Sequence, residues 1–364
     1  MFKTPYEVEI GGKGNTKKII IGGTKPVTIQ TMWKESIIEL LHDNEKFNKT
    51  VERIEKLELL GCDILRFAVP DMESAEALLK LSQTVKMPLV ADIHFDYKLA
   101  LRCLDGNIAK IRINPGNIGS IERTKAVVDK AKETGTALRI GINTGSLPKD
   151  LATLGEEKKI SRAEGLVKTA AREMEIFDKL NFNQFIVSMK ASSVAETIES
   201  NEKFAEIYNA PLHIGVTEAG PLIGGVVKST MAFSRLLSEK IGSTIRVSLS
   251  STPENEIITA KEIVRELGLR RGGVKIVSCP RCGRNGFDVH AFIDRWQNEL
   301  LSMDKDITVA VMGCVVNGPG EGKTADIGIT GAGNSVIIFK HGAVVRTVSA
   351  SQADAAFREE LNSL

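Results

Sequence analysis

The chain has 364 residues, of which 42% are hydrophobic and 26% charged, so it can bury a large core and form more than one domain. Its formal net charge of +2 and the lack of a basic block argue against nucleic-acid binding, and no apolar stretch approaches the roughly 18 residues that span a bilayer. Five cysteines, an odd number, and an N-terminus without a signal-peptide pattern predict a cytoplasmic protein with reduced thiols.

Eight short apolar runs alternate with longer stretches of helical period in the first 267 residues. The runs cover residues 27–32, 63–69, 89–93, 111–114, 138–143, 185–190, 212–217 and 245–249. Eight βα units in this length predict an α/β protein with a (β/α)8 barrel of the TIM type. An open doubly wound sheet is the alternative, although no GxGxxG pattern follows the first run. We expect the barrel domain to span residues 1–267.

Polar residues gather at the C-terminal ends of these runs. They are Arg66, Asp92 with His94, Arg112 with Asn114, Arg139 with Asn143, Ser188 with Lys190, Thr217 with Glu218, and Arg246 with Ser248 and Ser250. Many are two or four residues apart, which places both members on one face of a strand, and in a closed barrel that face is the interior. The C-terminal rim is also where barrel enzymes place their sites, so these residues predict a binding site there.

Five of these residues are Arg or Lys, and their convergence predicts a phosphate or diphosphate ester as the ligand. A single strand-end Arg is often paired with a carboxylate, but Asp92 and Glu218 neutralise only two of the five. His94 is interpreted equally well as an oriented site residue or as a packed rim histidine. Three other lysines are interpreted as surface charges of helices or loops: Lys98, Lys110 and Lys132.

The pattern changes after a charged, glycine-rich linker at residues 268–273, and residues 274–364 predict a smaller α+β domain. We expect strands at 275–277, 307–312, 326–329, 336–339 and 344–348, and a helix at 288–303. Gly342 is expected in a hairpin turn. Ser351 and Asp354 predict a capping box at the start of a final helix.

This second domain carries Cys279, Cys282, Cys314 and, in a glycine-rich loop, Glu321. A CxxC pair alone fits zinc knuckles, redox dithiols and iron–sulfur sites. The absence of a second CxxC or a suitably spaced histidine pair disfavours structural zinc, and the third thiol is not needed by a dithiol. Three thiolates with a harder fourth ligand favour a [4Fe–4S] cluster with one loosely held iron. The remaining cysteines, Cys62 and Cys103, are expected in the core.

The chain resembles the bacterial (E)-4-hydroxy-3-methylbut-2-enyl diphosphate synthases of the methylerythritol phosphate route to isoprenoids, nearly from end to end. The most specific segments are 278–284 and 312–321, supported by 91–94, 110–116, 139–143, 216–220 and 244–248. The resemblance implies a barrel joined to a [4Fe–4S] domain. It also implies reductive ring opening and dehydroxylation of 2-C-methyl-D-erythritol 2,4-cyclodiphosphate to (E)-4-hydroxy-3-methylbut-2-enyl diphosphate.

The family's site residues carry over to matching positions of this chain. Cluster ligation corresponds to Cys279, Cys282, Cys314 and Glu321, and substrate binding corresponds to Arg66, His94, Arg112, Arg139, Asn143, Lys190, Arg246 and Ser248. Glu218 matches the proton donor and Asn317 a substrate contact beside the cluster. The resemblance further implies flavodoxin or ferredoxin as electron donor, and a head-to-tail homodimer in which one subunit's cluster domain covers the other's barrel.

Two segments depart from the family pattern: residues 30–35, which include Trp33, and residues 331–335, which include Asn334 and Ser335. Neither contains a proposed ligand. The rival enzyme interpretation is a pterin-type barrel methyltransferase with a structural zinc appendage. The non-enzymatic alternative is a metal-bearing scaffold or an RNA-binding module, which would not require small-molecule binding at Arg112 or Arg246.

Overall fold

The computed structural model of the chain describes residues 2–114, 118–280, 282 and 286–364, except for the side chains of Ser146, Asn317, Pro319 and Glu321. The chain divides into two compact units, Met1–Arg270 and Arg271–Leu364. No helix in the described ranges combines the length and the apolar character needed to cross a membrane.

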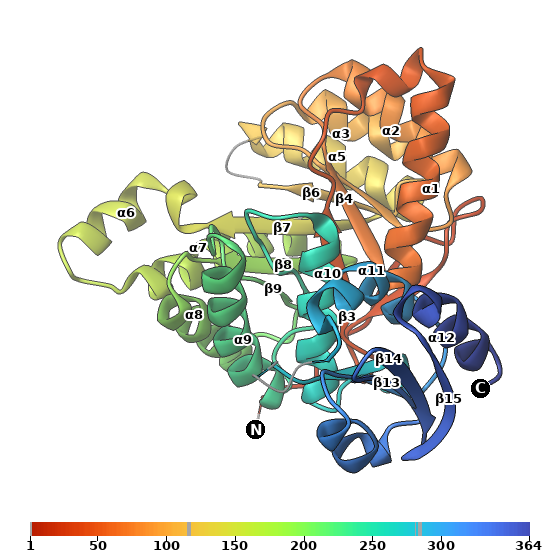
Figure 1. Cartoon of the computed structure of the whole chain (residues 1–364). Coiled ribbons are helices and arrows are strands. Elements are labelled where there is room, and N and C mark those ends of the chain that lie inside the picture. The colour runs from red at the N-terminus through yellow and green to blue at the C-terminus, as the bar shows by residue number, and fades with distance from the viewer. Residues whose placement is uncertain (1, 115–117, 281, 283–285) are drawn as a thin grey trace. The chain divides into compact units, whose positions relative to one another are not determined.

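The first unit is built on an eight-stranded, all-parallel sheet (Figure 1). Its strands are β3 (Thr28–Met32), β4 (Ile64–Ala68), β5 (Leu89–Asp92), β6 (Lys110–Ile113), β7 (Ala137–Asn143), β8 (Phe185–Lys190), β9 (His213–Ile214) and β10 (Thr244–Ile245). The order β8-β7-β6-β5-β4-β3-β10-β9 leaves β8 and β9 at the ends. A parallel bridge between Val187 and Leu212, with Val187 N donating to Pro211 O at 3.0 Å, joins those ends. The predicted TIM-type barrel is therefore confirmed.

Two strands are shorter than the runs that predict them. β9 and β10 pair over only two residues each, although the sequence predicts strands at 212–217 and 245–249. The chain continues extended past the ladder, since Arg246 N still donates to Ile214 O at 3.1 Å. The predicted strands are therefore longer than the regularly paired ones, and the unpaired residues that follow each strand include several that line the site.

Helices follow the strands around the outside of the barrel (Figure 1). They are α1 (Asn44–Leu60), α2 (Met72–Thr84), α3 (Tyr97–Leu104), α5 (Ile121–Thr134), α6 (Lys149–Glu156), α7 (Arg162–Lys179), α8 (Val194–Ile207), α9 (Leu222–Ser238) and α10 (Pro253–Glu266). Side-chain caps fix many of their starts, for example Asp71 at α2 and the Ser161–Glu164 capping box at α7. In a βα unit the helix begins near the C-terminal end of its strand, so several positive helix ends face the same rim.

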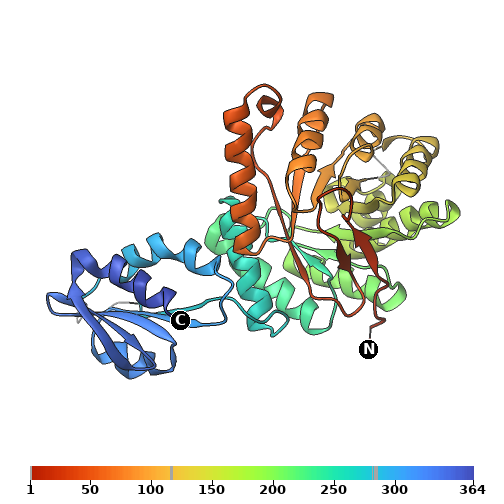
Figure 2. The same ribbon diagram turned by 90° about the vertical axis from the view of Figure 1, so that its right-hand side faces the viewer.

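A short antiparallel hairpin precedes the barrel and was not predicted from the sequence. It consists of β1 (Val8–Ile10) and β2 (Ile19–Ile21) (Figure 2, dark red). Its side chains form one buried cluster with residues at the beginnings of several barrel strands: Val8, Ile10 and Ile21 with Ile64, Val90, Ala109, Ala137 and Ile186. This hairpin plug closes the N-terminal end of the barrel with apolar side chains.

The second unit contains a five-stranded mixed sheet, in the order β11-β12-β13-β14-β15, with two helices. The strands are β11 (Lys275–Ser278), β12 (Thr308–Met312), β13 (Ile327–Ala332), β14 (Ser335–Lys340) and β15 (Ala343–Ser349), and the helices are α11 (Val289–Leu301) and α12 (Ala353–Asn362). Phe292, Trp296 and Phe357 from these helices form the core with the sheet. Gly342 has φ +81° between β14 and β15, as a turn there requires.

The predicted capping box at the last helix is wrong. α12 begins after Gln352, which provides no side-chain cap. The Asp354 carboxylate instead accepts hydrogen bonds from Trp296 Nε1 at 2.8 Å and from Arg295 at 3.1 Å. Partners on α11 thus use the carboxylate that a local capping motif assigns to the helix's own backbone.

Candidate functional site

The C-terminal end of the barrel encloses a cavity of about 250 Å³. Its lining consists of Arg66, Asp92, His94, Arg112, Arg139, Asn143, Ser188, Lys190, Thr217, Glu218, Arg246 and Ser248. All but two of the barrel residues that the sequence analysis assigns to a site therefore lie around one cavity; the exceptions, Asn114 and Ser250, line two other cavities at the same end of the barrel. The shared interior face of the strands accounts for this convergence.

Two interior glycines make room for the cations. A Cβ on Gly141 of β7 would lie 2.2 Å from Arg112 Nε, and Arg112 Nη2 donates to the Gly141 carbonyl at 3.2 Å. A Cβ on Gly215 would lie 2.9 Å from Lys190 Nζ and 2.8 Å from the Arg246 carbonyl oxygen. All three distances are too short for a nonbonded carbon atom, so these positions require glycine while the cations stay where they are.

Asp92 is the buried carboxylate at the centre of this cluster. Its oxygens lie 3.2 Å from Arg112 Nη1, 3.7 Å from Arg66 Nε and 3.4 Å from His94 Nε2. Burial alone would raise the pKa of Asp92, but Arg66, the hydrogen bond with His94, and Arg112 outweigh burial and lower it below its ordinary value. Asp92 therefore stays ionised and orients two guanidinium groups toward the cavity.

Glu256 is a second buried carboxylate, which the sequence analysis did not identify. It extends from α10 to accept hydrogen bonds from Thr31 Oγ1 at 2.6 Å and Leu249 N at 3.0 Å. Lys34 Nζ lies 2.9 Å away, and Arg246 Nε is more distant at 3.9 Å. Since Lys34 already pairs with Glu256, this carboxylate only partly offsets Arg246.

Cations exceed carboxylates in the described barrel interior. Six of them are Arg66, Lys110, Arg112, Arg139, Lys190 and Arg246, against the buried carboxylates Asp92 and Glu256. Burial and the neighbouring Arg66 lower the pKa of Arg246 to about 10. The same two causes lower the pKa of Arg139, but a guanidinium keeps its proton in proteins. The resulting repulsion favours binding of a multiply charged anion.

Lys110 is not a surface charge, so that prediction is wrong. It lies on β6 with its side chain fully buried, two residues before Arg112 on the same interior face. No hydrogen-bond partner for its Nζ is found among the described residues. The other two lysines assigned to the surface, Lys98 and Lys132, are exposed.

His213 is another interior residue that the sequence analysis did not identify. It lies on β9, fully buried, with Nε2 at 3.1 Å from Lys190 Nζ. Burial and Lys190 lower the pKa of His213 well below its ordinary value, so the ring is neutral.

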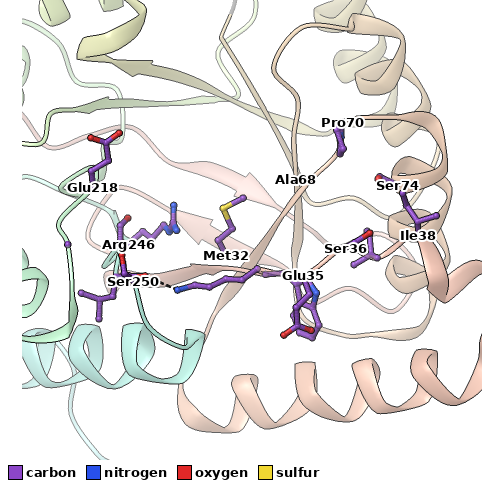
Figure 3. A pocket seen from close by; sticks show the side chains of 16 residues that line it. Met32, Glu35, Ser36, Ile38, Ala68, Pro70, Ser74, Glu218, Arg246 and Ser250 are labelled. Carbon is purple, nitrogen blue, oxygen red and sulfur yellow. Dashed lines mark hydrogen bonds between the residues drawn. The ribbon is translucent and has the colours of Figure 1, made fainter.

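Glu218 is the exposed carboxylate of the site and lies at a junction. Its φ of +53° is unusual for a residue other than glycine, and it lies in a turn together with Thr217. It lines the cavity of about 250 Å³ and two adjoining ones, of about 440 Å³ and about 570 Å³. In the largest cavity, Glu218 and Arg246 lie across from Ser36, Pro70 and Ser74 (Figure 3).

Trp33 lines the same large cavity as Glu218. It stacks on Phe67 at 5.7 Å, and the Arg53 guanidinium lies 4.9 Å above its ring. Trp33 therefore forms part of the wall beside the cationic cavity.

The second unit brings two of the predicted cysteines close together. Cys279 follows β11, and its Sγ accepts a hydrogen bond from Gly313 N at 3.0 Å, immediately before Cys314. Cys314 is buried, Cys282 is exposed, and none of the cysteines is in a disulfide. N–H groups directed at cysteine sulfur suit a thiolate centre. Within the described residues, however, no three His, Cys, Asp or Glu side chains are placed to hold a metal ion.

Two predicted residues of this centre, Asn317 and Glu321, have side chains outside the described part. Their backbone lies in a short π-helix, Val316–Gly320, and in the 3-10 helix Glu321–Thr324 that follows it. The cysteines predicted for the core are confirmed there, because Cys62 and Cys103 are buried and burial raises the pKa of each thiol to about 12.

The fold and site together define a TIM-type barrel with a cation-lined cavity at its C-terminal end, followed by a cysteine-bearing α+β unit. The sequence matches the GcpE TIM-barrel domain over residues 12–261 and the GcpE protein C-terminal domain over residues 275–363. The chain belongs to the GcpE family.

Named relatives agree with this assignment. The chain is 57% identical to a 4-hydroxy-3-methylbut-2-en-1-yl diphosphate synthase (flavodoxin) of Treponema denticola, with 100% of this chain and 99% of that one covered. It is 44% identical to the enzyme of the same name from Clostridium tetani, with coverage of 100% and 99%. Among solved structures, a Coxiella burnetii dihydropteroate synthase in complex with pteroic acid has a TM-score of 0.48 at 12% identity, covering 72% of this chain and 97% of that one.

Proposed function

We propose that the chain reduces 2-C-methyl-D-erythritol 2,4-cyclodiphosphate to (E)-4-hydroxy-3-methylbut-2-enyl diphosphate in isoprenoid biosynthesis. The observation that carries this proposal is the cavity of about 250 Å³, in which cations outnumber carboxylates and an exposed Glu218 forms part of the wall. The names of relatives at 57% and 44% identity support the same reaction. They do not support the pterin-type methyltransferase alternative.

The barrel residues bind and orient the cyclic diphosphate. Guanidinium groups make paired hydrogen bonds to phosphate oxygens, and Arg66, Arg112, Arg139 and Arg246 line the cavity. Because Asp92 holds the first two of these at 3.7 and 3.2 Å, their positions are set before the ligand arrives. Asn143, Lys190, His94 and Ser248 complete the proposed substrate-binding set.

The reaction consumes two electrons and a proton. One C–O bond breaks to open the ring and leaves its oxygen on the diphosphate, a second breaks to release water, and a C=C bond forms between the two carbons. We assign the protonation of the departing oxygen to Glu218, because it is exposed to all three cavities and is not held by an ion pair that we find among the described residues.

The Glu218→Gln variant tests this assignment. It retains the shape of the side chain but cannot supply the proton, so we expect the cyclodiphosphate to bind normally and turnover to fall by roughly 100-fold or more. The matched control is Glu55→Gln, at an exposed position on α1. Turnover within a few-fold of wild type in Glu218→Gln would exclude the proposed role.

We further propose that Cys279, Cys282 and Cys314, with Glu321 as the fourth ligand, hold a [4Fe–4S] cluster. Cysteines that form no disulfide and the Gly313 N–H donated to Cys279 fit such a centre. The bound cluster would supply the electrons one at a time to the substrate. Asn317 is proposed as a substrate contact beside it.

Metal analysis and turnover test the centre together. Protein prepared without air is expected to contain about four iron and four sulfide per chain and to reduce the cyclodiphosphate with a reduced carrier. Glu321→Ala should retain the fold but change the cluster spectrum. One zinc without sulfide, or an unchanged spectrum in Glu321→Ala, would contradict the cluster or its fourth ligand respectively.

We propose flavodoxin as the electron donor, because the relatives' names include it, and ferredoxin as the alternative. The proposed location of the reaction is the cytoplasm. A head-to-tail homodimer is proposed as well. The first unit ends at Arg270, which donates to the Gly61 carbonyl at 3.3 Å and to Asp63 at 2.5 Å, just before β4 begins. This is the end of the barrel opposite the cavity, and the point at which the first unit ends supports the proposal that another copy's cysteine unit completes the site.

Mixing two inactive variants tests the dimer. Glu218→Gln retains an intact cysteine unit and Cys279→Ser an intact barrel, so a mixed head-to-tail dimer contains one complete site. We expect partial recovery of activity on mixing and reassembly. No recovery, in a mixture shown to contain mixed dimers, would place both halves of the site in one chain.

The non-enzymatic alternative makes an opposite prediction. If the chain is a scaffold or an RNA-binding module, reversing the charge of Arg112 or Arg246 leaves small-molecule binding intact. We expect cyclodiphosphate binding to be lost in both variants while the fold is retained.

A further inference from the structure

Lys190 links the cationic cavity to a buried imidazole beneath it. Its side chain lines the cavity, and its Nζ lies 3.1 Å from His213 Nε2. The other ring nitrogen, Nδ1, has no hydrogen-bond partner in the described part of the chain. Among the described residues, we find no carboxylate paired with Lys190, and its hydrogen-bond partner is the His213 imidazole.

The contact limits how many protons the pair can hold. An ammonium and an imidazolium present only donors, so they cannot share a hydrogen bond. A charged Lys190 donates to a neutral His213, whereas a neutral Lys190 either donates to an unprotonated Nε2 or accepts from Nε2–H, according to the tautomer of the ring. The doubly protonated state is excluded at 3.1 Å.

The surrounding charges decide between these two states. The strands that face Lys190 and His213 contribute Arg66 from β4, Lys110 and Arg112 from β6, Arg139 from β7, and Arg246 beyond β10. Against them stand Asp92 from β5, paired with Arg66 and Arg112, and Glu256 from α10, paired with Lys34. His94 and Glu218 lie at the rim.

Only lysine can relieve this repulsion. Guanidinium groups do not lose protons, and His213 is already neutral. Lys110 and Lys190 are therefore the only two of the six cations that can become neutral. Burial and Arg139 lower the pKa of Lys190 well below its ordinary value, in agreement with this argument.

We propose that Lys190 is a neutral amine in the empty barrel and takes up a proton when the diphosphate dianion binds, becoming an ammonium that donates to both the ligand and His213. His213 is then a positioning residue, which holds the amine at the cavity wall in both states. Lys110, which does not line the cavity, is not the site of this uptake. The inference rests on the proposed substrate, and extends it by coupling substrate binding to protonation of the site.

Calorimetric titration in two buffers of different ionisation enthalpy counts the protons taken up. Two dianions that do not titrate near neutral pH serve as probes, the cyclodiphosphate and sulfate, each added to the oxidised holoprotein without an electron donor. At pH 8 we expect uptake of about one proton per dianion bound. Binding of either probe with an enthalpy that does not depend on the buffer would overturn the proposal.

Variants assign the proton to one lysine. Lys190→Met should bind sulfate more weakly and without proton uptake, whereas Lys110→Met removes another buried lysine and should retain the uptake. Lys125→Met, at an exposed position on α5, is the surface control. Loss of uptake in Lys110→Met, or its persistence in Lys190→Met, would overturn the assignment to Lys190.

The wild-type protein provides an independent measurement if Lys190→Met does not fold. Because binding takes up a proton, the Kd for sulfate should rise about tenfold per pH unit above the pKa of Lys190 in the empty barrel and level off below it. A Kd that is constant from pH 5.5 to 9 would overturn the proposal. Failure of the cyclodiphosphate alone to bind would instead contradict the proposed function, since sulfate still reports the coupling.

Discussion

Replacing Gly141 with alanine should weaken substrate binding although no charged residue is replaced. The new Cβ would lie 2.2 Å from Arg112 Nε and 2.9 Å from both Cζ and Nη2. Nonbonded carbon contacts need roughly 3.5 Å, so one partner must move by about 1 Å. β7 pairs with β6 and β8 on either side, which holds the backbone, and the guanidinium group has to give way.

The displaced guanidinium loses its bonds to Asp92 and to the Gly141 carbonyl, both at 3.2 Å, and no longer points at the ligand. A hydrogen bond to a charged group contributes about 1.5–3 kcal/mol, so the Kd for the cyclodiphosphate should rise roughly 10- to 100-fold. Calorimetric titration at constant pH measures this change directly. Thermal unfolding should show only a moderate loss, because overpacking costs about 1–3 kcal/mol.

Gly224→Ala is the matched control, since a Cβ at that position of α9 meets nothing within 4 Å. It should leave binding unchanged and stabilise the helix by about 0.5–1 kcal/mol. If Gly141→Ala binds the cyclodiphosphate as tightly as wild type, the position of Arg112 does not depend on the lack of a side chain at residue 141, and the reasoning fails.

Three further predictions concern stability. The pKa of Asp92 is depressed in the folded state, so its contribution to stability is present above its unfolded pKa of about 4 and is lost as the pH falls further. Asp92→Asn should therefore unfold at a lower denaturant concentration than wild type at pH 7, and should lose less stability than wild type between pH 5 and 3. Equal acid sensitivity of the two proteins would contradict this. Asp354→Ala leaves Trp296 Nε1 without its acceptor and should cost about 1–3 kcal/mol in denaturant unfolding of the second unit, an unchanged midpoint being the opposing result. Trp33→Ala removes the buried ring stacked on Phe67 and should cost about 3–5 kcal/mol; a loss below 1 kcal/mol would show that the ring packs loosely.

The barrel and its cationic cavity could be predicted because strand alternation is a local property. Arg139 and Asn143 are four residues apart on β7, and this spacing alone places both on the interior face. Lys110 carried the same signal, since it is two residues before Arg112. It was missed because the predicted strand began at residue 111, one residue after the observed start of β6.

Other features depend on contacts that a local pattern does not reveal. Glu256 lies in the first turn of α10, where an acidic residue is ordinary, and only the packing of that helix brings it to Thr31 and Lys34. The hairpin plug was missed because β1 and β2 are each three residues long, too short for a clear period of two. His213 carried the alternation signal, since it is four residues before Thr217 in the predicted run 212–217. It was missed because it lies at the beginning of that run, whereas the predicted site consists of residues at the C-terminal ends.

Because of the hairpin plug, the barrel is open only at its C-terminal end. Its apolar side chains seal the floor, so substrate, product and any released water molecule share one passage through the rim. Product and water must therefore leave before the next substrate enters, and a molecule that stays bound at the rim blocks both entry and release. A polar substitution at Val8 or Ile10 would admit bulk water at the N-terminal end of the barrel. That water would screen the electrostatic field that the interior cations produce.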